Sequence, residues 1–238
     1  MKFISITVRI VVAAFLLFYA YSCLISPKIT SPEFLKKYNG PEITYFQETA
    51  FERKKSVIKW EDKIRISLMG NFSVQDSLEV VRVVGEVSPL VTVPIELLPG
   101  NSKDGNLQIY LLKSAAEDEA AVSEKDLAKA MAKTEYRFAM LSNRIVGAKI
   151  FVYHFADTKY WVLRHEFCHA LGLSGHSKQM TKQHRLLGPE LFDSIEESEA
   201  WKDKKEHTFP EPVKKSIQLL YEKDLPIGLK KKDFYKRF

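Results

Sequence analysis

The segment from His165 to His176 places three imidazoles and one carboxylate at a spacing that suits a catalytic metal site. On a helix, His165 and His169 stand one turn apart on the same face, so both rings can reach one ion. Zinc binds imidazole nitrogen at about 2.0–2.1 Å, which two ligands stacked in this way can satisfy. Glu166 follows the first histidine directly and can accept a proton from water as a general base. The pattern predicts a zinc site with Glu166 as its base.

The surroundings of the two histidines argue against an ordinary pair of surface residues. The expected helix is apolar almost all round, at Trp161, Val162, Leu163, Phe167, Cys168, Ala170 and Leu171. Imidazoles and a carboxylate carried into such surroundings are costly to bury without partners, and a metal removes that cost. We expect Asp157 or Thr158 to begin the helix and Gly172 to end it in a left-handed conformation.

The third ligand is expected from the turn that follows the helix. The stretch Leu173-Ser174-Gly175 is long enough to reverse the chain and bring His176 back to the ion. His184 is the alternative, and it would need a longer excursion through the polar residues 177–183. We therefore expect the metal ligands to be His165, His169 and His176.

The motif resembles that of the metzincin zinc proteases, HExxHxxGxxH followed by a turn that contains a methionine. Four positions match it: His165, Glu166, His169 and Gly172. Gly175 stands where metzincins have the third histidine, so the resemblance implies a loop that bulges to deliver His176 one residue later. For the methionine turn, the chain offers Met180, or the stretch 193–195 without a methionine.

A bacterial family of uncharacterised, exported, metzincin-like proteins is similar to this chain over most of its length. The similarity rests on four patterns: Trp60, Ile64 and Ile66; Asn106, Leu107 and Ile109; Ala170-Leu171-Gly172-Leu173 before the third ligand; and Leu220, Tyr221 and Gly228. Many members of that family have replaced the zinc histidines, whereas this chain keeps them. The resemblance implies a mixed α/β fold in which helices, including the HExxH helix, back a twisted sheet.

The N-terminus has the pattern of a bacterial export signal. Lys2 and Arg9 precede an apolar run over 10–20, and Ala20-Tyr21-Ser22-Cys23 resembles a processing or lipidation site. An uncleaved anchor is the alternative, although the run is short for a hydrocarbon core of about 30 Å. We expect residues 1–28 to be a signal peptide or a membrane or lipid anchor, and 29–238 to be one zinc-peptidase domain.

Charge and cysteine content narrow the classes of partner. The formal net charge is +6, and part of it lies in the tail 230–238, which we expect to be a solvated terminus unless it contacts anionic lipid or an acidic partner. No nucleic-acid-binding motif accompanies the charge, so we expect no nucleic-acid partner. Cys23 belongs to the leader or its processing site and Cys168 lies on the metal-binding helix, so we expect no disulfide between them. We expect Cys168 to be a small core residue.

Hydrophobic periodicity predicts the elements that position the site. Strands are expected over 64–68, over 107–112 and, at an irregular or edge position broken by Pro94, over 93–97. Helices are expected from a cap at Asp76, over 123–133, and over 212–223. A hairpin is expected from 136–141 and 145–152, whose second strand should border the cleft and pair with an extended substrate.

These observations predict a zinc-dependent metallopeptidase that acts on proteins or peptides outside the cytoplasm. Candidates for stabilising the oxyanion are Tyr153, Tyr160, His184 and His207. A zinc-containing binding module without turnover, or a structural protein of the cell envelope, is the alternative. Glu166 favours the enzyme, because a purely structural tetrahedral site has no need of a carboxylate beside its ligands.

Overall fold

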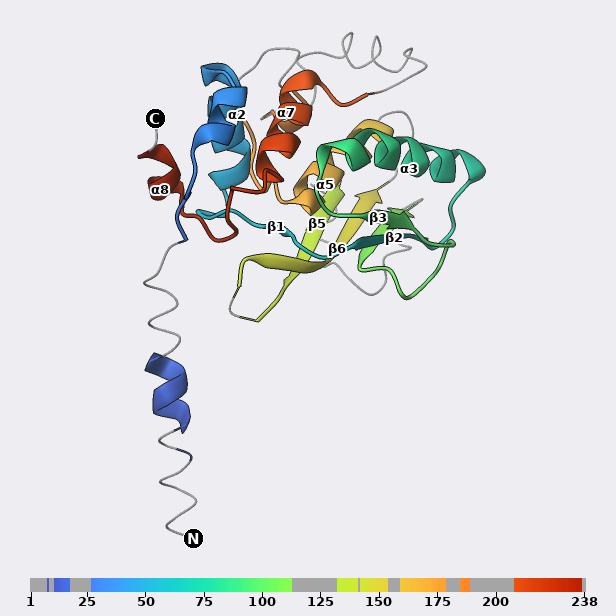
Figure 1. Cartoon of the computed structure of the whole chain (residues 1–238). Coiled ribbons are helices and arrows are strands. Elements are labelled where there is room, and N and C mark those ends of the chain that lie inside the picture. The colour runs from blue at the N-terminus through green and yellow to red at the C-terminus, as the bar shows by residue number, and fades with distance from the viewer. Residues whose placement is uncertain are drawn as a thin grey trace.

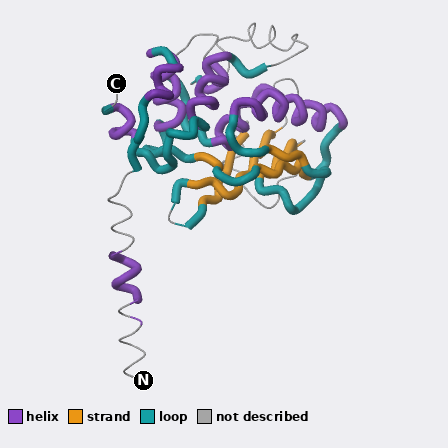
Figure 2. Tube along the Cα trace, in the orientation of Figure 1, coloured by secondary structure: helices purple, strands orange, loops and turns teal. Residues whose placement is uncertain are grey.

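The computed structural model describes residues 8, 11–17, 27–112, 132–140, 142–153, 159–178, 185–188 and 208–236. Its strands are β1 (Lys59–Trp60), β2 (Ile64–Met69), β3 (Ile95–Leu97), β4 (Leu107–Leu112), β5 (Ala132–Phe138) and β6 (Arg144–Tyr153). Its α-helices are α2 (Gly40–Phe51), α3 (Val74–Val87), α5 (Lys159–Leu171), α7 (Glu211–Leu220) and α8 (Lys231–Tyr235). Short 3-10 turns are η1 (Glu33–Lys37), η2 (Ser88–Leu90) and η4 (Arg185–Leu187). Figures 1 and 2 show helices α2, α3, α5 and α7 gathered on one side of the strands.

The six strands form one mixed sheet, which confirms the predicted α/β fold. Its order is β1-β6-β4-β2-β3, with parallel pairing throughout, and β5 pairs antiparallel with β6. The expected hairpin is therefore present as β5 and β6. The predicted strand over 93–97 is β3, at the end of the sheet, which confirms its edge position.

The expectation that β6 would pair with a substrate is wrong. Residues Ala148 to Tyr153 pair with β4, Arg144 and Ile145 pair with β1, and Ile145 to Val152 pair with β5. Both edges of β6 are thus occupied by the protein itself. Among the described strands, β5 has only β6 as its neighbour, so β5 lies at the border of the sheet.

Two helices differ from their predicted beginnings or ends. Ser73, not Asp76, is the N-cap of α3: the Ser73 hydroxyl accepts from the Asp76 amide at 3.1 Å, and the Asp76 carboxylate accepts from the Ser73 amide at 2.8 Å. The helix expected over 123–133 cannot reach its predicted end, because β5 begins at Ala132; residues 123–131 lie outside the described part. Pairing with β6 there overrides a local sequence that favours helix.

The C-terminal tail docks on the body of the protein, contrary to a solvated terminus. Phe234 is fully buried, and its ring lies 5.5 Å from the rings of Phe46 and Phe51 on α2. Lys230 forms an isolated antiparallel bridge with Ser56. The closing helix over 212–223 is confirmed as α7, which ends at Leu220.

Of the expected leader, residues 8, 11–17 and 27–28 are described, and 11–17 are helical. Among the residues with a described structure, no helix combines the length and apolarity needed to cross a membrane.

We predict that Phe234→Ala lowers the free energy of unfolding by roughly 3–5 kcal/mol, because it leaves a cavity between two aromatic rings of α2. Tyr235→Ala, at a neighbouring side chain that is 44% exposed, should cost about 1 kcal/mol or less. Urea denaturation of both variants measures the difference. Equal stabilities would show that the tail does not contribute to the core.

Candidate metal centre

The end of α5 is fixed by the backbone as predicted. Gly172 has φ of +120°, the Gly172 amide donates to the His169 carbonyl at 2.7 Å, and the Leu173 amide donates to the Cys168 carbonyl at 3.1 Å. A side chain at position 172 would also meet the Ile58 carbonyl oxygen at 2.2 Å. Glycine is therefore required at this position, and the chain turns where the metal motif needs it to turn.

Side chains from three other elements bind the last carbonyls of α5. The donors are Tyr136 Oη to His169 at 2.6 Å, Trp60 Nε1 to Ala170 at 2.8 Å, and Tyr221 Oη to Leu171 at 3.0 Å. The His169 carbonyl also accepts from the Gly172 amide, whereas the bonds to the Ala170 and Leu171 carbonyls satisfy groups that burial would otherwise penalise. The three bonds also fix the end of α5 to β5, to β1 and to the residue that follows α7.

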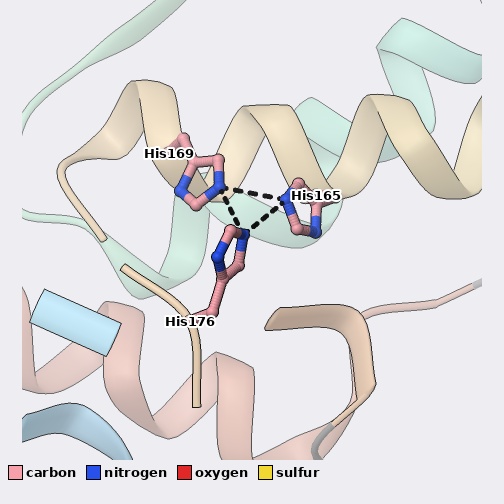
Figure 3. Close-up of side chains that lie close together, drawn as sticks. All are labelled: His165, His169 and His176. Atoms are coloured by element: carbon pink, nitrogen blue, oxygen red, sulfur yellow. Dashed lines mark hydrogen bonds between the residues drawn. The ribbon is translucent and has the colours of Figure 1, made fainter. Parts of the chain in front are cut away.

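The structure brings the three predicted histidines together. Their Nε2 atoms are 3.0 Å apart for His165 and His169, 3.2 Å for His165 and His176, and 3.3 Å for His169 and His176 (Figure 3). Two rings come from α5 and the third from the loop that follows it. All three can supply a ligand atom to one metal ion.

Hydrogen bonds at the other ring nitrogens decide what these Nε2 atoms can do. His165 Nδ1 lies 2.5 Å from the Leu186 carbonyl, and His169 Nδ1 lies 2.5 Å from the Leu173 carbonyl. A carbonyl only accepts, so each Nδ1 carries the hydrogen and each Nε2 of a neutral ring presents a lone pair. Tetrahedral ligands at 2.0–2.1 Å from an ion are about 3.3 Å apart, which is close to the spacing observed here. The residues therefore fit a metal ion.

Burial keeps these rings in the neutral, ligating form. It lowers the pKa of His165 to about 4, with a further contribution from His176. Burial likewise holds the pKa of His169 well below its ordinary value and lowers the pKa of His176, where the positive charge of Arg53 adds to the effect. At neutral pH no proton has to be displaced before a cation binds.

Glu166 is buried beside the histidines and is held by a residue that the sequence did not reveal. Thr134 Oγ1, on β5, donates to Glu166 Oε2 at 2.6 Å. Burial raises the pKa of Glu166 to about 7, and the Thr134 hydrogen bond partly offsets the rise. A cavity of about 400 Å³ opens over the site, and its walls include the three histidines, Glu166, Thr134 and Tyr136.

The loop that carries His176 is fastened to α2, an element that the sequence analysis missed. The His176 amide donates to Glu52 Oε2 at 2.5 Å, and the Ser177 hydroxyl donates to Glu48 Oε2 at 2.5 Å. A Cβ on Gly175 would lie 2.4 Å from Glu52 Cβ, so only glycine allows this approach. A capping box of Asn39 and Glu42, with Pro41 in the first turn, was the available sequence signal for α2.

The remaining candidates take no part in the described site. Cys168 is a fully buried free thiol in the core, as predicted. Tyr160 donates to Asp76 on α3 at 3.2 Å. The others fall outside what the structure describes: Asp157, Thr158, Met180, His184, His207, the stretch 193–195 and the side chain of Tyr153.

We predict that His176→Ala weakens metal binding by more than the roughly 10–100-fold typical of residues outside the ligand set. His184→Ala should leave stoichiometric binding intact. Titration against a chromophoric chelator measures both affinities. The opposite pattern would make His184 the third ligand.

A second prediction concerns the carboxylate that positions the loop. Glu52→Ala should weaken metal affinity about 10–100-fold, because the His176 amide loses its acceptor. Glu52→Gln keeps an oxygen that can accept this bond and should bind metal nearly as the native chain does. If alanine and glutamine behave alike, the hydrogen bond does not position His176.

No family model matches the chain, and no match is found among curated proteins. What the protein does is therefore inferred from the residues of the site.

Proposed function

We propose that this protein is a zinc-dependent metallopeptidase of metzincin-like design, with His165, His169 and His176 as metal ligands. The observation that carries the proposal is the convergence of three Nε2 atoms within 3.3 Å beside a buried glutamate in an open cavity. Three protein ligands leave a coordination position for water or substrate, which is typical of catalytic rather than structural zinc.

The donor set favours zinc among the divalent metals. Imidazole nitrogens suit zinc, copper, nickel and iron, and the spacing of the three Nε2 atoms matches a tetrahedral ion, which zinc accepts readily. A zinc ion held there supplies a Lewis acid that lowers the pKa of water and polarises a peptide carbonyl.

Glu166 is the general base in this proposal. Its pKa of about 7 suits a group that must both accept and release a proton near neutrality. The carboxylate takes the proton of the attacking water and delivers it to the nitrogen of the leaving amine. Thr134 holds Oε2 by its 2.6 Å hydrogen bond and so limits the orientations available to the carboxylate.

The border strand β5 replaces β6 as the partner of an extended substrate. Ala132, Thr134 and Tyr136 of β5 line the cavity. A peptide that adds to the outer edge of β5 would be held by main-chain hydrogen bonds, with its scissile bond beside the histidines. Such binding gives affinity with little demand on sequence.

The site of action that we propose is outside the cytoplasm. The proposal is supported by the export pattern of residues 1–28 and by the likeness to exported metzincin-like proteins. The proposed substrate is a protein or a peptide. The apolar N-terminal segment would allow the protein to associate with a membrane. No nucleic-acid partner is proposed.

We predict that Glu166→Gln retains stoichiometric metal but lowers kcat/KM for peptide hydrolysis by about 10²–10⁴-fold, because the amide keeps the shape and removes the base. Glu61→Gln, at an exposed carboxylate in the turn before β2, is the matched control and should cleave like the native chain. A peptide-library cleavage assay with metal analysis reads both effects. Native-like turnover by Glu166→Gln would remove Glu166 from the mechanism, and loss of metal would make it a ligand.

A further inference from the structure

We propose that the cavity over the histidines selects peptides that carry a carboxylate close to the scissile bond, and that Arg53 and Lys54 bind this carboxylate. The inference rests on the proposed peptidase function and names the substrate class of that site.

Two exposed cations reach the cavity from the segment that follows α2. Arg53 and Lys54 both line it, and neither forms an ion pair with any carboxylate in the part of the chain that the structure describes. Lys54 Nζ lies 5.2 Å from the centroid of the Phe138 ring, which directs this ammonium towards β5. Lys54 therefore stands beside β5, the strand along which an extended peptide would lie, and Arg53 lines the same cavity.

The other charged groups nearby do not neutralise these two. Among the described residues that line this cavity, Glu166 alone carries a carboxylate, and the proposed mechanism uses it as the base. The carboxylate of Glu52 already accepts from the His176 amide. Lys133 also contributes to the wall, but its ammonium pairs with Glu135 at 2.9 Å and lies 4.6 Å from the Phe151 ring centroid. The charge left without a partner is positive.

Arg53 and the three histidines line the same cavity. A metal ion would add positive charge to the same region, and like charges repel. A substrate carboxylate beside Arg53 offsets this repulsion.

A peptide can supply that carboxylate in two ways. The guanidinium of Arg53 matches a carboxylate with two parallel hydrogen bonds, and Lys54 adds a point charge. An aspartate or glutamate side chain next to the scissile bond and a free C-terminal carboxylate offer the same chemistry. Matched peptides separate the two sources.

The test uses the metal-loaded full chain and fluorogenic peptides taken from the cleavage library. One set of pairs differs only by Glu or Gln at each of the three positions on either side of the cleaved bond, and another differs only by a free or amidated C-terminus. Where a peptide binds without turnover, Kd from fluorescence polarisation replaces kcat/KM. We expect one acidic peptide to be preferred by about tenfold or more, as one charge-assisted hydrogen bond allows, and the preference to fall with added salt.

Variants assign the preference to its residues. Arg53→Met and Lys54→Met should each reduce the acid-to-amide ratio towards one, and Arg53→Glu should invert it, with metal content showing that the site is intact. Lys55→Met is the matched control, since Lys55 is exposed in the same segment but does not line the cavity; it should keep the native ratio.

Cleavage without any acidic preference, or a preference that survives Arg53→Glu, overturns the carboxylate subsite and leaves the peptidase. Preferential binding without cleavage overturns the peptidase and leaves the subsite. Neither binding nor cleavage overturns both.

Discussion

Three neutral imidazoles that point nitrogen atoms at one another within 3.3 Å are the constraint that the rest of the structure serves. Two of the rings have their Nδ1 hydrogens committed to carbonyls, so their Nε2 atoms are acceptors facing acceptors. Such an arrangement is stable only if the fold holds the rings in place or a cation joins them. This fold holds the rings in place, and the three imidazole nitrogens are suitable ligands for a cation.

The site is held in place by residues that are distant from it in the sequence. Donors from β1, from β5 and from Tyr221, which follows α7, fix the carbonyl end of α5. Carboxylates at the end of α2 and directly after it hold the loop that carries His176. On the far side of α5, the fully buried Arg164 pairs with Glu79 and, at 2.9 Å, with Glu86 of α3. Removing one member of such a buried network leaves an uncompensated charge, so α5 is strongly tied to α3.

Local sequence supports the predictions that held at the metal motif, whereas long-range pairing caused the errors at β5 and β6. The helical spacing of His165 and His169 and the turn at Gly172 depend on neighbouring residues, so the sequence predicts them directly. Thr134 and Glu52 are remote in sequence from the groups they hold, and no periodicity connects them. β5 was placed too late in the chain because pairing with β6, rather than local propensity, sets where it begins. The likeness to metzincins and the export of the protein remain predictions, since they depend on relatives and on the leader rather than on the fold.

We propose that three histidines hold a metal and leave one coordination position open. X-ray absorption spectroscopy at the zinc edge of the zinc-loaded full chain tests it most directly. We expect one zinc per chain with only nitrogen and oxygen ligands at about 2.0–2.1 Å, three of them imidazoles, and an oxygen from solvent. A sulfur ligand at about 2.3 Å, four protein ligands, or zinc that survives loss of His176 would contradict it.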